Sequence, residues 1–394
     1  MSATNARNRP AKPKSSTPEK MQKKPFLFIV QSGGMDFTFL ILVLLLLAIG
    51  LVMLFSASYP YAYYNRGNSF EFISSQSLYA VLGIVLMLFI STLNYRILEN
   101  LATVAMGFSL FLLVIVLFFP HDGARRWIDL GFITFQPSEV AKFTVVILFA
   151  AMINKNYDKM KDFRHGVVPF IAVLGVVSIL MLMEPHLSGT VLILAIGAIM
   201  MIVGGTDMKW FFLAAALAIA GLVVIVATGA ISYAMPRITS WLDPFSDPRG
   251  DGFQTIQSLF AIGSGGLMGT GIGNSRQKYL YLPEPQNDFI FAIVCEELGF
   301  VGAVGVILLF ALLVWRGFVI AMRCRDRFGS LVAVGLTAQV GVQAILNIMV
   351  VTNTIPNTGI SLPFFSAGGT ALIMLLAQMG VILSISRHAT MVKE

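Results

Sequence analysis

Apolar residues in this sequence come in long runs, separated by short polar segments. A bilayer crossing needs about 20 mainly apolar residues, and ten runs approach or exceed that length. They span residues 37–58, 76–93, 100–119, 137–153, 167–183, 187–204, 210–229, 289–315, 329–351 and 370–386. The fourth to sixth runs are short or interrupted, so their boundaries are soft. The pattern predicts an all-α polytopic membrane protein with ten transmembrane helices.

The composition supports this prediction. Hydrophobic residues make up 57% of the chain and charged residues 12%, whereas an ordinary soluble domain is about 45–50% apolar and about 25% charged. So little charge excludes a soluble enzyme, a disordered protein and a nucleic-acid-binding domain. The two cysteines, Cys295 and Cys324, cannot build a disulfide framework, and we interpret both as packing residues.

The positions of lysine and arginine predict the orientation. If the N-terminus is cytoplasmic, most of the 27 Lys and Arg residues fall on inner segments, as the positive-inside rule requires. An even number of crossings then places both termini in the cytoplasm. We expect a disordered basic cytoplasmic tail over 1–35, a transmembrane domain over 36–387 and a cytoplasmic C-terminus over 388–394.

The longest outer segment is the loop 230–288, between the seventh and eighth crossings. Phe253, Ile256, Phe260 and Gly263 recur in it at helical spacing, which predicts a half-helix on the membrane surface. The glycines that follow match no nucleotide-binding motif, so we interpret them as turns.

Three glycines interrupt the eighth apolar run, at positions 299, 302 and 305. They are consistent with a bend or with a close helix contact. We favour the close contact.

Asp288 lies where the outer loop runs into the eighth helix. Aspartate at a helix start is often an N-cap, because it accepts hydrogen bonds from free backbone N–H groups. A carboxylate at the outer membrane surface is also suited to general base catalysis. Position alone favours the cap, and the two roles are compatible.

Charged residues inside apolar runs are costly and usually face a cavity or a partner. Glu296 and Glu297 are two such residues, and Lys142 in the fourth run is a candidate partner for one of them. Glu139 shares a helix face with Lys142 because it lies three residues earlier. These charges indicate either a structural ion pair or a polar cavity that opens outward.

Arg125, Arg126 and Trp127 lie together at the outer interface. The tryptophan alone would be an interfacial anchor, but arginine is suited to bidentate phosphate recognition, and polyprenyl pyrophosphates occur in the outer leaflet. His186 is isolated, so the sequence indicates no protein-built metal site. A divalent ion such as Mg²⁺ could still be held between a carboxylate and a pyrophosphate.

Three stretches, in order along the chain, resemble motifs of the SEDS family (shape, elongation, division and sporulation). The first is Ala124-Arg125-Arg126-Trp127-Ile128-Asp129 followed by Gln136-Pro137-Ser138-Glu139 and Lys142. The second is Asn287-Asp288-Phe289-Ile290-Phe291-Ala292 with Glu296-Glu297-Leu298-Gly299. The third is Pro356-Asn357-Thr358-Gly359-Ile360-Ser361-Leu362-Pro363-Phe364-Phe365-Ser366 with Gly368-Gly369-Thr370. The resemblance covers residues 36–387, including the ten-helix count.

The resemblance implies a peptidoglycan glycosyltransferase that polymerises lipid II into glycan strands at the outer face of the bacterial cytoplasmic membrane. It further implies a class B penicillin-binding protein as partner, together with other division proteins. The amino-acid sequences of the motifs are most similar to those of the cell-division members, with sporulation and elongation relatives as alternatives. The family has no organic cofactor, and a substrate-held Mg²⁺ or Mn²⁺ is compatible with it.

The family's functional positions can be carried over residue by residue. Its essential outer-loop aspartate matches Asp288, which overturns the cap-only interpretation and makes this residue the expected general base. Its functional arginine matches Arg126, and its fourth-helix lysine matches Lys142. We expect these two, with Arg125, Glu139 and Glu297, to bind the substrate pyrophosphate.

Two rival functions remain open. A lipid II flippase or transporter would also use intramembrane charges, although it needs them across the bilayer, whereas most of these gather toward the outer half. A membrane scaffold without catalysis would tolerate the loss of Asp288.

Overall fold

The computed structural model describes residues 34–119, 126–129, 134–216, 235–250 and 252–389. Its long helices are α1 (Phe37–Arg66), α2 (Glu71–Ile90), α3 (Ile97–Val116), α4 (Pro137–Asn156), α6 (Val168–Met183), α7 (Leu187–Val203), α11 (Ile290–Arg323), α12 (Arg327–Val351) and α13 (Gly369–Ala389). The short helical elements are η1 (Tyr157–Lys159), α5 (Phe163–Gly166), α9 (Met235–Leu242), η2 (Pro244–Ser246) and α10 (Phe253–Gly265). Strands β1 (Ile128–Asp129) and β2 (Thr134–Phe135) pair antiparallel.

The protein is an all-α polytopic membrane protein. Within the described residues, eight helices are long and apolar enough to cross a membrane, and α7 is a shorter apolar helix. Each of these nine helices corresponds to one of the predicted apolar runs. The seventh run, 210–229, is helical up to residue 216, and the rest of it lies outside the described residues, as does the predicted tail up to residue 33.

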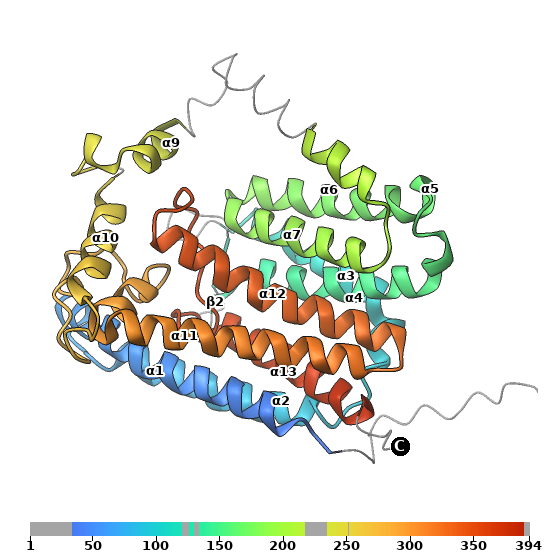
Figure 1. The fold of residues 1–394 in the computed structure, drawn as a ribbon, viewed down its shortest axis with the longest axis horizontal. Helices are drawn as coiled ribbons and strands as arrows, with labels where there is room; N and C mark the ends of the chain where they lie inside the picture. The colour runs from blue at the N-terminus through green and yellow to red at the C-terminus, as the bar shows by residue number, and fades with distance from the viewer. Residues whose placement is uncertain (1–33, 120–125, 130–133, 217–234, 251, 390–394) are drawn as a thin grey trace, which may run out of the picture.

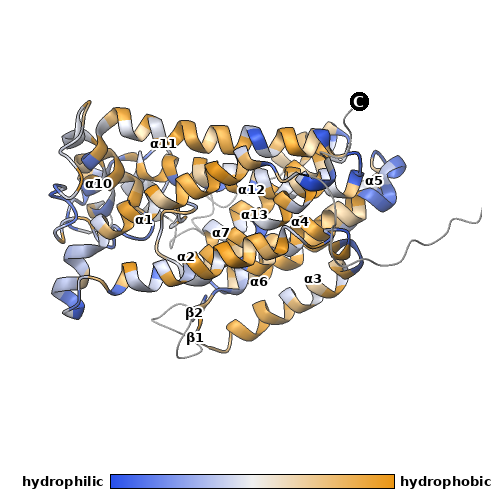
Figure 2. Cartoon of the chain, turned by 90° about the horizontal axis from the view of Figure 1, so that it is seen from below, coloured by the Kyte–Doolittle hydropathy of each residue, from blue (hydrophilic) through white to orange (hydrophobic). Residues whose placement is uncertain are grey.

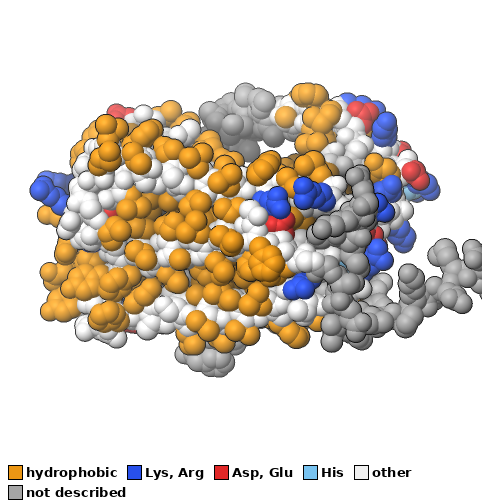
Figure 3. All heavy atoms as spheres, turned by 60° about the horizontal axis from the view of Figure 1, so that its bottom comes forward, with side chains coloured by type: hydrophobic (Ala, Val, Ile, Leu, Met, Phe, Trp, Pro, Cys, Tyr) orange, Lys and Arg blue, Asp and Glu red, His pale blue; other side chains and the backbone are white. Residues whose placement is uncertain are grey.

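The surface has the distribution that a bilayer requires. Hydrophobic side chains cover the middle of the face shown in Figure 3, and most of the Lys and Arg seen there gather toward the end that carries the C-terminus. Figure 2 shows the same apolar character along the helices, with polar residues toward their ends. On α3, Phe108 and Phe111 are 56% and 58% exposed, and Phe118, just beyond the end of that helix, is 76% exposed. Such side chains are stable in contact with lipid, which is as apolar as they are.

The interior of the bundle lies around α4, α12 and α13. These helices bury most of their residues, and they pack against α3, α11 and α2, respectively. In Figure 1 the helices lie side by side with their axes roughly parallel. This arrangement brings the starts of α4, α7, α11 and α13 to one end of the bundle, together with the end of α12. Helix α10 and the segment that follows it lie at that same end.

Two local expectations about the outer loop and the eighth helix had different outcomes. The helical spacing in the loop is confirmed by α10, which buries Ile256 and leaves Phe260 50% exposed. The prediction of a close helix contact at the glycines of α11 is wrong for Gly299. This residue has φ 67° and ψ −169° and breaks the helix. The backbone that approaches it belongs to the loop around Gly269 rather than to another helix.

Candidate active site

A polar cavity of about 250 Å³ opens at the end of the bundle where α4, α7 and α13 begin. It lies opposite the basic end that carries the C-terminus. The structure brings together four of the predicted site residues in its lining, namely Arg126, Glu139, Lys142 and Asp288. Of the other two predicted residues, Arg125 lies outside the described residues, and Glu297 belongs to a different cluster.

Asp288 is held at the cavity by its backbone. Asn347 of α12 donates from Nδ2 to the carbonyl oxygen of Asp288 at 2.8 Å and to that of Ile360 at 2.6 Å. The cap position of α11 is Phe289, and no side chain caps that helix start. The cap interpretation from position alone is therefore wrong, and the Asp288 carboxylate faces the cavity instead.

The environment of Asp288 changes its acidity. The residue is only partly exposed, and burial raises the pKa of its carboxyl from 3.8 to about 6. The positive charge of Arg126 opposes this pKa shift and the negative charge of Glu284 adds to it. Desolvation disfavours the charged carboxylate, so the group becomes a stronger base while it still ionises near neutral pH.

Lys142 and Glu139 form a buried ion pair in the first two turns of α4. Lys142 Nζ lies 2.7 Å from Glu139 Oε1 and donates to Gln343 Oε1 of α12 at 3.3 Å. The expectation that Lys142 pairs with Glu296 or Glu297 is wrong. One turn of α4 brings Glu139 to the same helix face as Lys142. The two residues form an ion pair and also line a polar cavity, so both of the alternatives drawn from the sequence apply to them.

Glu297 pairs with Lys278 of the outer loop instead, at 2.8 Å. Both side chains are almost completely buried, and neither lines the cavity described above. The assignment of Glu297 to substrate binding stays a prediction, but its position gives it a different set of partners.

Arg126 is the cationic group nearest to solution in this cavity. It lies just before β1, is half-buried, and its Nε has no hydrogen-bond partner in the described part of the chain. Trp127 beside it also lines the cavity. An arginine with unused donors at an open cavity can bind an anionic oxygen pair.

Sequence reasoning missed several polar residues of this region. Among them, His186 lines the cavity and lies 3.3 Å from Gln136, atom Nε2 to atom Nε2. Burial, with Arg126 and Lys142 nearby, lowers its pKa to about 3, so the ring is neutral. Glu184 is fully buried without a hydrogen-bond partner among the described residues, and burial raises its pKa to about 8. No local motif marks either residue, because the charged side chains that affect their pKa values, Arg126 and Lys142, lie far from them in the sequence.

The fold and the cavity together define a class: a polytopic membrane protein with a polar, cation-lined site at one end of its helix bundle. The family model of the FtsW/RodA/SpoVE cell cycle proteins matches residues 37–391. The chain therefore belongs to this family, the SEDS family, as the sequence motifs indicated.

Individual relatives agree with this assignment. The chain is 40% identical over 342 residues to Stage V sporulation protein E of Bacillus subtilis, covering 86% of this chain and 93% of that protein. It is 37% identical over 358 residues to the "Probable peptidoglycan glycosyltransferase FtsW" of Geobacter sp. strain M18, covering 90% and 97%.

Solved structures share the fold. One, described as "Structural coordination of polymerization and crosslinking by a peptidoglycan synthase complex", matches with a TM-score of 0.74 and 30% identity, covering 91% of this chain and 99% of that chain. The rod shape determining protein RodA of Thermus thermophilus matches with a TM-score of 0.63 and 28% identity, covering 90% and 97%.

Proposed function

We propose that this chain is a peptidoglycan glycosyltransferase that polymerises lipid II at the outer face of the bacterial cytoplasmic membrane. One observation carries the proposal: a raised-pKa carboxylate, Asp288, shares one cavity with two cationic side chains, Arg126 and Lys142. A base beside a pair of cations suits the transfer of a sugar from a pyrophosphate donor to a hydroxyl acceptor.

The proposed topology has ten crossings with both termini in the cytoplasm. It rests on the bias of lysine and arginine toward one end of the bundle and on the positive-inside rule. The cavity then opens to the outside, beside the large loop 230–288. The domain limits follow from it, with a cytoplasmic tail over 1–35, the membrane domain over 36–387 and a short inner end over 388–394.

In the proposed reaction, the acceptor hydroxyl of one lipid-linked sugar attacks the anomeric carbon of the donor. A new carbon–oxygen bond forms while the bond from that carbon to the pyrophosphate oxygen breaks. Asp288 takes the hydroxyl proton, because a neutral hydroxyl is a weak nucleophile. Attack from the side opposite the leaving group inverts the donor carbon.

The leaving pyrophosphate carries away the bonding electron pair and gains negative charge as the bond breaks. Arg126 and Lys142 are placed to stabilise that charge, and fixed cations are effective because they need no reorganisation during the reaction. Glu139 and Gln343 hold the Lys142 ammonium at the cavity wall. The polyprenyl tails extend from the cavity along apolar helix surfaces.

A divalent cation fits this site only as a companion of the substrate. In the part of the chain that the structure describes, no group of three His, Cys, Asp or Glu side chains could hold a metal ion. Glu284 lines the cavity without an ion-pair partner among the described residues. With the pyrophosphate oxygens it could hold Mg²⁺ or Mn²⁺, which would supply further positive charge, while the Asp288 carboxylate stays free to take the acceptor proton.

We propose that the enzyme works beside a class B penicillin-binding protein and other division proteins, at the division septum. The support is the family membership and the structural match to a peptidoglycan synthase complex. Sporulation and cell elongation are the alternative processes in which it would act. A fluorescent fusion followed through growth would separate them, since septal, polar-spore and lateral signals differ.

The direct test of the proposed function is polymerisation of lipid II by purified protein with its penicillin-binding partner and Mn²⁺ or Mg²⁺. Glycan ladders on a gel are the expected result. No ladder, combined with transfer of lipid II across liposome membranes, would contradict the polymerase and support the flippase.

The polymerisation rate is expected to depend on pH through Asp288. The base must be deprotonated to act, and burial raises its pKa to about 6. The rate should therefore be near its plateau above about pH 7 and fall about tenfold per pH unit below about pH 5. Initial rates between these limits check the prediction, with size-exclusion profiles to confirm that the protein stays folded. A flat profile across pH 6 would remove Asp288 as the titrating base.

Gly359→Ala is expected to slow polymerisation by about ten- to a hundredfold, because small misplacements of reacting groups cost that much. Gly359 has φ 68°, and an added Cβ would lie 3.1 Å from Asp288 Oδ2. The matched control is Gly305→Ala in α11, where the added Cβ meets nothing within 4 Å. Rates for both variants, compared at equal amounts of folded protein, test the prediction, and equal rates would contradict it.

A further inference from the structure

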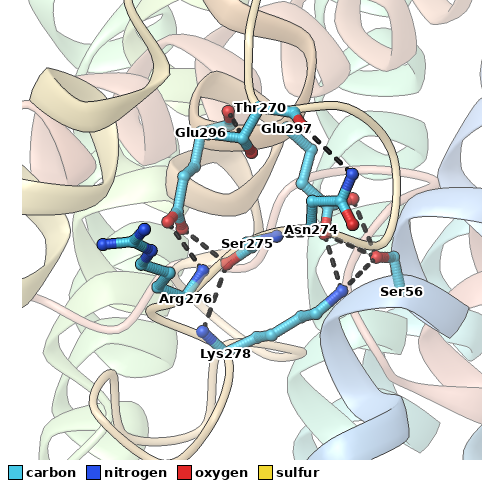
Figure 4. A network of polar contacts seen from close by, with 8 residues as sticks. All are labelled: Ser56, Thr270, Asn274, Ser275, Arg276, Lys278, Glu296 and Glu297. Carbon is cyan, nitrogen blue, oxygen red and sulfur yellow. Dashed lines mark hydrogen bonds and ion pairs between the residues drawn. The ribbon is translucent and has the colours of Figure 1, made fainter.

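A second buried polar cluster lies where α1, α11 and the outer loop meet (Figure 4). At its centre, Lys278 Nζ lies 2.8 Å from Glu297 Oε1 and donates to Ser56 Oγ at 3.0 Å. The Ser56 hydroxyl lies 2.7 Å from both carboxylate oxygens of Glu297. We call the Lys278–Glu297 pair, with Ser56, the loop latch.

The neighbouring carboxylate continues the same contact. Glu296 accepts hydrogen bonds from the hydroxyl of Ser275 at 2.5 Å and from the backbone N–H of Arg276 at 2.8 Å. The Lys278, Glu296 and Glu297 side chains are all buried. Breaking such a buried ion pair is strongly unfavourable because it leaves one charge uncompensated. Both glutamates of α11 thus bind one short segment of the loop.

The latch lies at the break in α11. At Gly299 the helix loses its regular backbone pairing, and the loop supplies the missing partners on both sides of this residue. Four backbone hydrogen bonds of 2.9 to 3.2 Å do this: Thr270 N to Glu296 O, Gly271 N to Glu297 O, Phe300 N to Gly266 O and Val301 N to Leu267 O. Buried backbone N–H and C=O groups need hydrogen-bond partners. The loop provides these partners for the helix ends on both sides of the break.

The break leaves a short first piece of α11, Ile290–Leu298, which starts two residues after Asp288. It is about 13 Å long at 1.5 Å per residue, and the positions from Ile290 to Glu297 are all buried. One end of this piece is tied to the latch. The other end is tied to α12, where Asn347 donates to the Asp288 carbonyl. The depth of Asp288 in the cavity therefore depends on both ties.

We propose that Lys278 and Glu297 are positioning residues for the transfer reaction, and that the buried pair fixes the first piece of α11 and so the place of the Asp288 carboxylate. None of the described residues that line the cavity belongs to the latch, so its effect is carried by the helix piece. The inference rests on the proposed function for its catalytic consequence. The structural part of the inference, that the latch fixes the position of Asp288, is independent of the proposed function, because the position of residue 288 can be measured without any reaction.

The first experiment measures that position directly. Asp288→Cys is made in full-length protein with Cys295→Ala and Cys324→Ala, which removes both native cysteines. A membrane-impermeant maleimide then reports the access of water to position 288. Adding Lys278→Met is expected to speed labelling about tenfold, because local opening exposes the segment. Lys209→Met is the matched control, since it removes an exposed ion pair of the same 2.8 Å length, to Asp207.

Lys278→Met can fail to fold because it leaves the Glu297 carboxylate buried alone. The double variant Lys278→Met with Glu297→Gln removes both charges and avoids that cost. Faster labelling in either folded variant, with the Lys209→Met control at the starting rate, supports the proposal. An unchanged labelling rate in the folded double variant overturns it.

The second experiment measures catalysis with Asp288 intact. In the double variant, kcat for polymerisation is expected to fall about tenfold with KM for lipid II unchanged, as for a misplaced reacting group. The acidic limb of the rate profile should also move below pH 6, since water reaching Asp288 removes the cause of its raised pKa. A purely structural pair would lower the folded fraction and leave the profile of the folded protein unmoved. If the starting protein makes no glycan, the proposed function fails while the labelling result still decides the latch.

Discussion

Replacing Asp288 with asparagine is expected to reduce lipid II polymerisation by about 10²- to 10⁴-fold, the usual contribution of a positioned general base. The amide keeps the shape of the carboxylate but cannot take the proton of the acceptor hydroxyl. Folding should be unaffected, because Asn347 holds the backbone carbonyl of residue 288 rather than its side chain. The variant should even be slightly more stable, since a partly buried charge is removed. Glycan ladders from purified protein, quantified against time, are the measurement.

Asp243→Asn is the matched control for this prediction. Asp243 belongs to the same outer loop, is exposed, and accepts a hydrogen bond from the backbone N–H of Phe245. An asparagine can accept that bond equally well, so its ladders should match those of the starting protein. Full polymerisation by a folded Asp288→Asn protein would exclude the base assignment. It would also favour the scaffold or flippase alternatives.

Most of the membrane fold could be predicted from the sequence because lipid imposes one simple requirement on every crossing. Each span must pair its own backbone groups and expose apolar side chains, so hydropathy alone finds helices such as α12 and α13 to within a few residues. The ends are less predictable. α1 runs on to Arg66, past the expected end at residue 58, and ends at Gly67, which has φ 69° and donates its backbone N–H to the carbonyl of Tyr63. Hydropathy does not register such a cap, because the polar turns before it are still helical.

The pairing of charged residues was predictable only where the two partners are close in sequence. Glu139 and Lys142 lie one turn apart on one helix, so their pairing follows from local geometry. The pairing of Glu297 with Lys278 crosses a loop whose path no local pattern fixes. Lys278 therefore looked like an ordinary outer-loop charge. The break at Gly299 belongs to the same contact, because the loop backbone supplies the hydrogen bonds that make the break stable.

Lys142→Met is expected to lower the polymerisation rate by about 10²- to 10³-fold, the usual cost of removing one group that stabilises developing negative charge. It should also destabilise the protein by about 3–5 kcal/mol, because Glu139 would remain buried without its partner. The two losses have different causes and can be separated. Thermal unfolding in detergent measures the loss of stability, and polymerisation rates per folded molecule measure the loss of catalysis.

Two further variants make that separation. Glu139→Gln with Lys142→Met removes both charges, so the unfolding temperature should return toward that of the starting protein while polymerisation stays slow. Glu139→Gln alone leaves the Lys142 ammonium in place and free to bind pyrophosphate, so it should retain far more activity than either Lys142 variant. Recovery of the rate together with the unfolding temperature in the double variant would show that Lys142 only braces the bundle. Continued loss of rate at restored stability is expected, because Lys142 lines the cavity in which the proposed reaction would develop negative charge on the pyrophosphate.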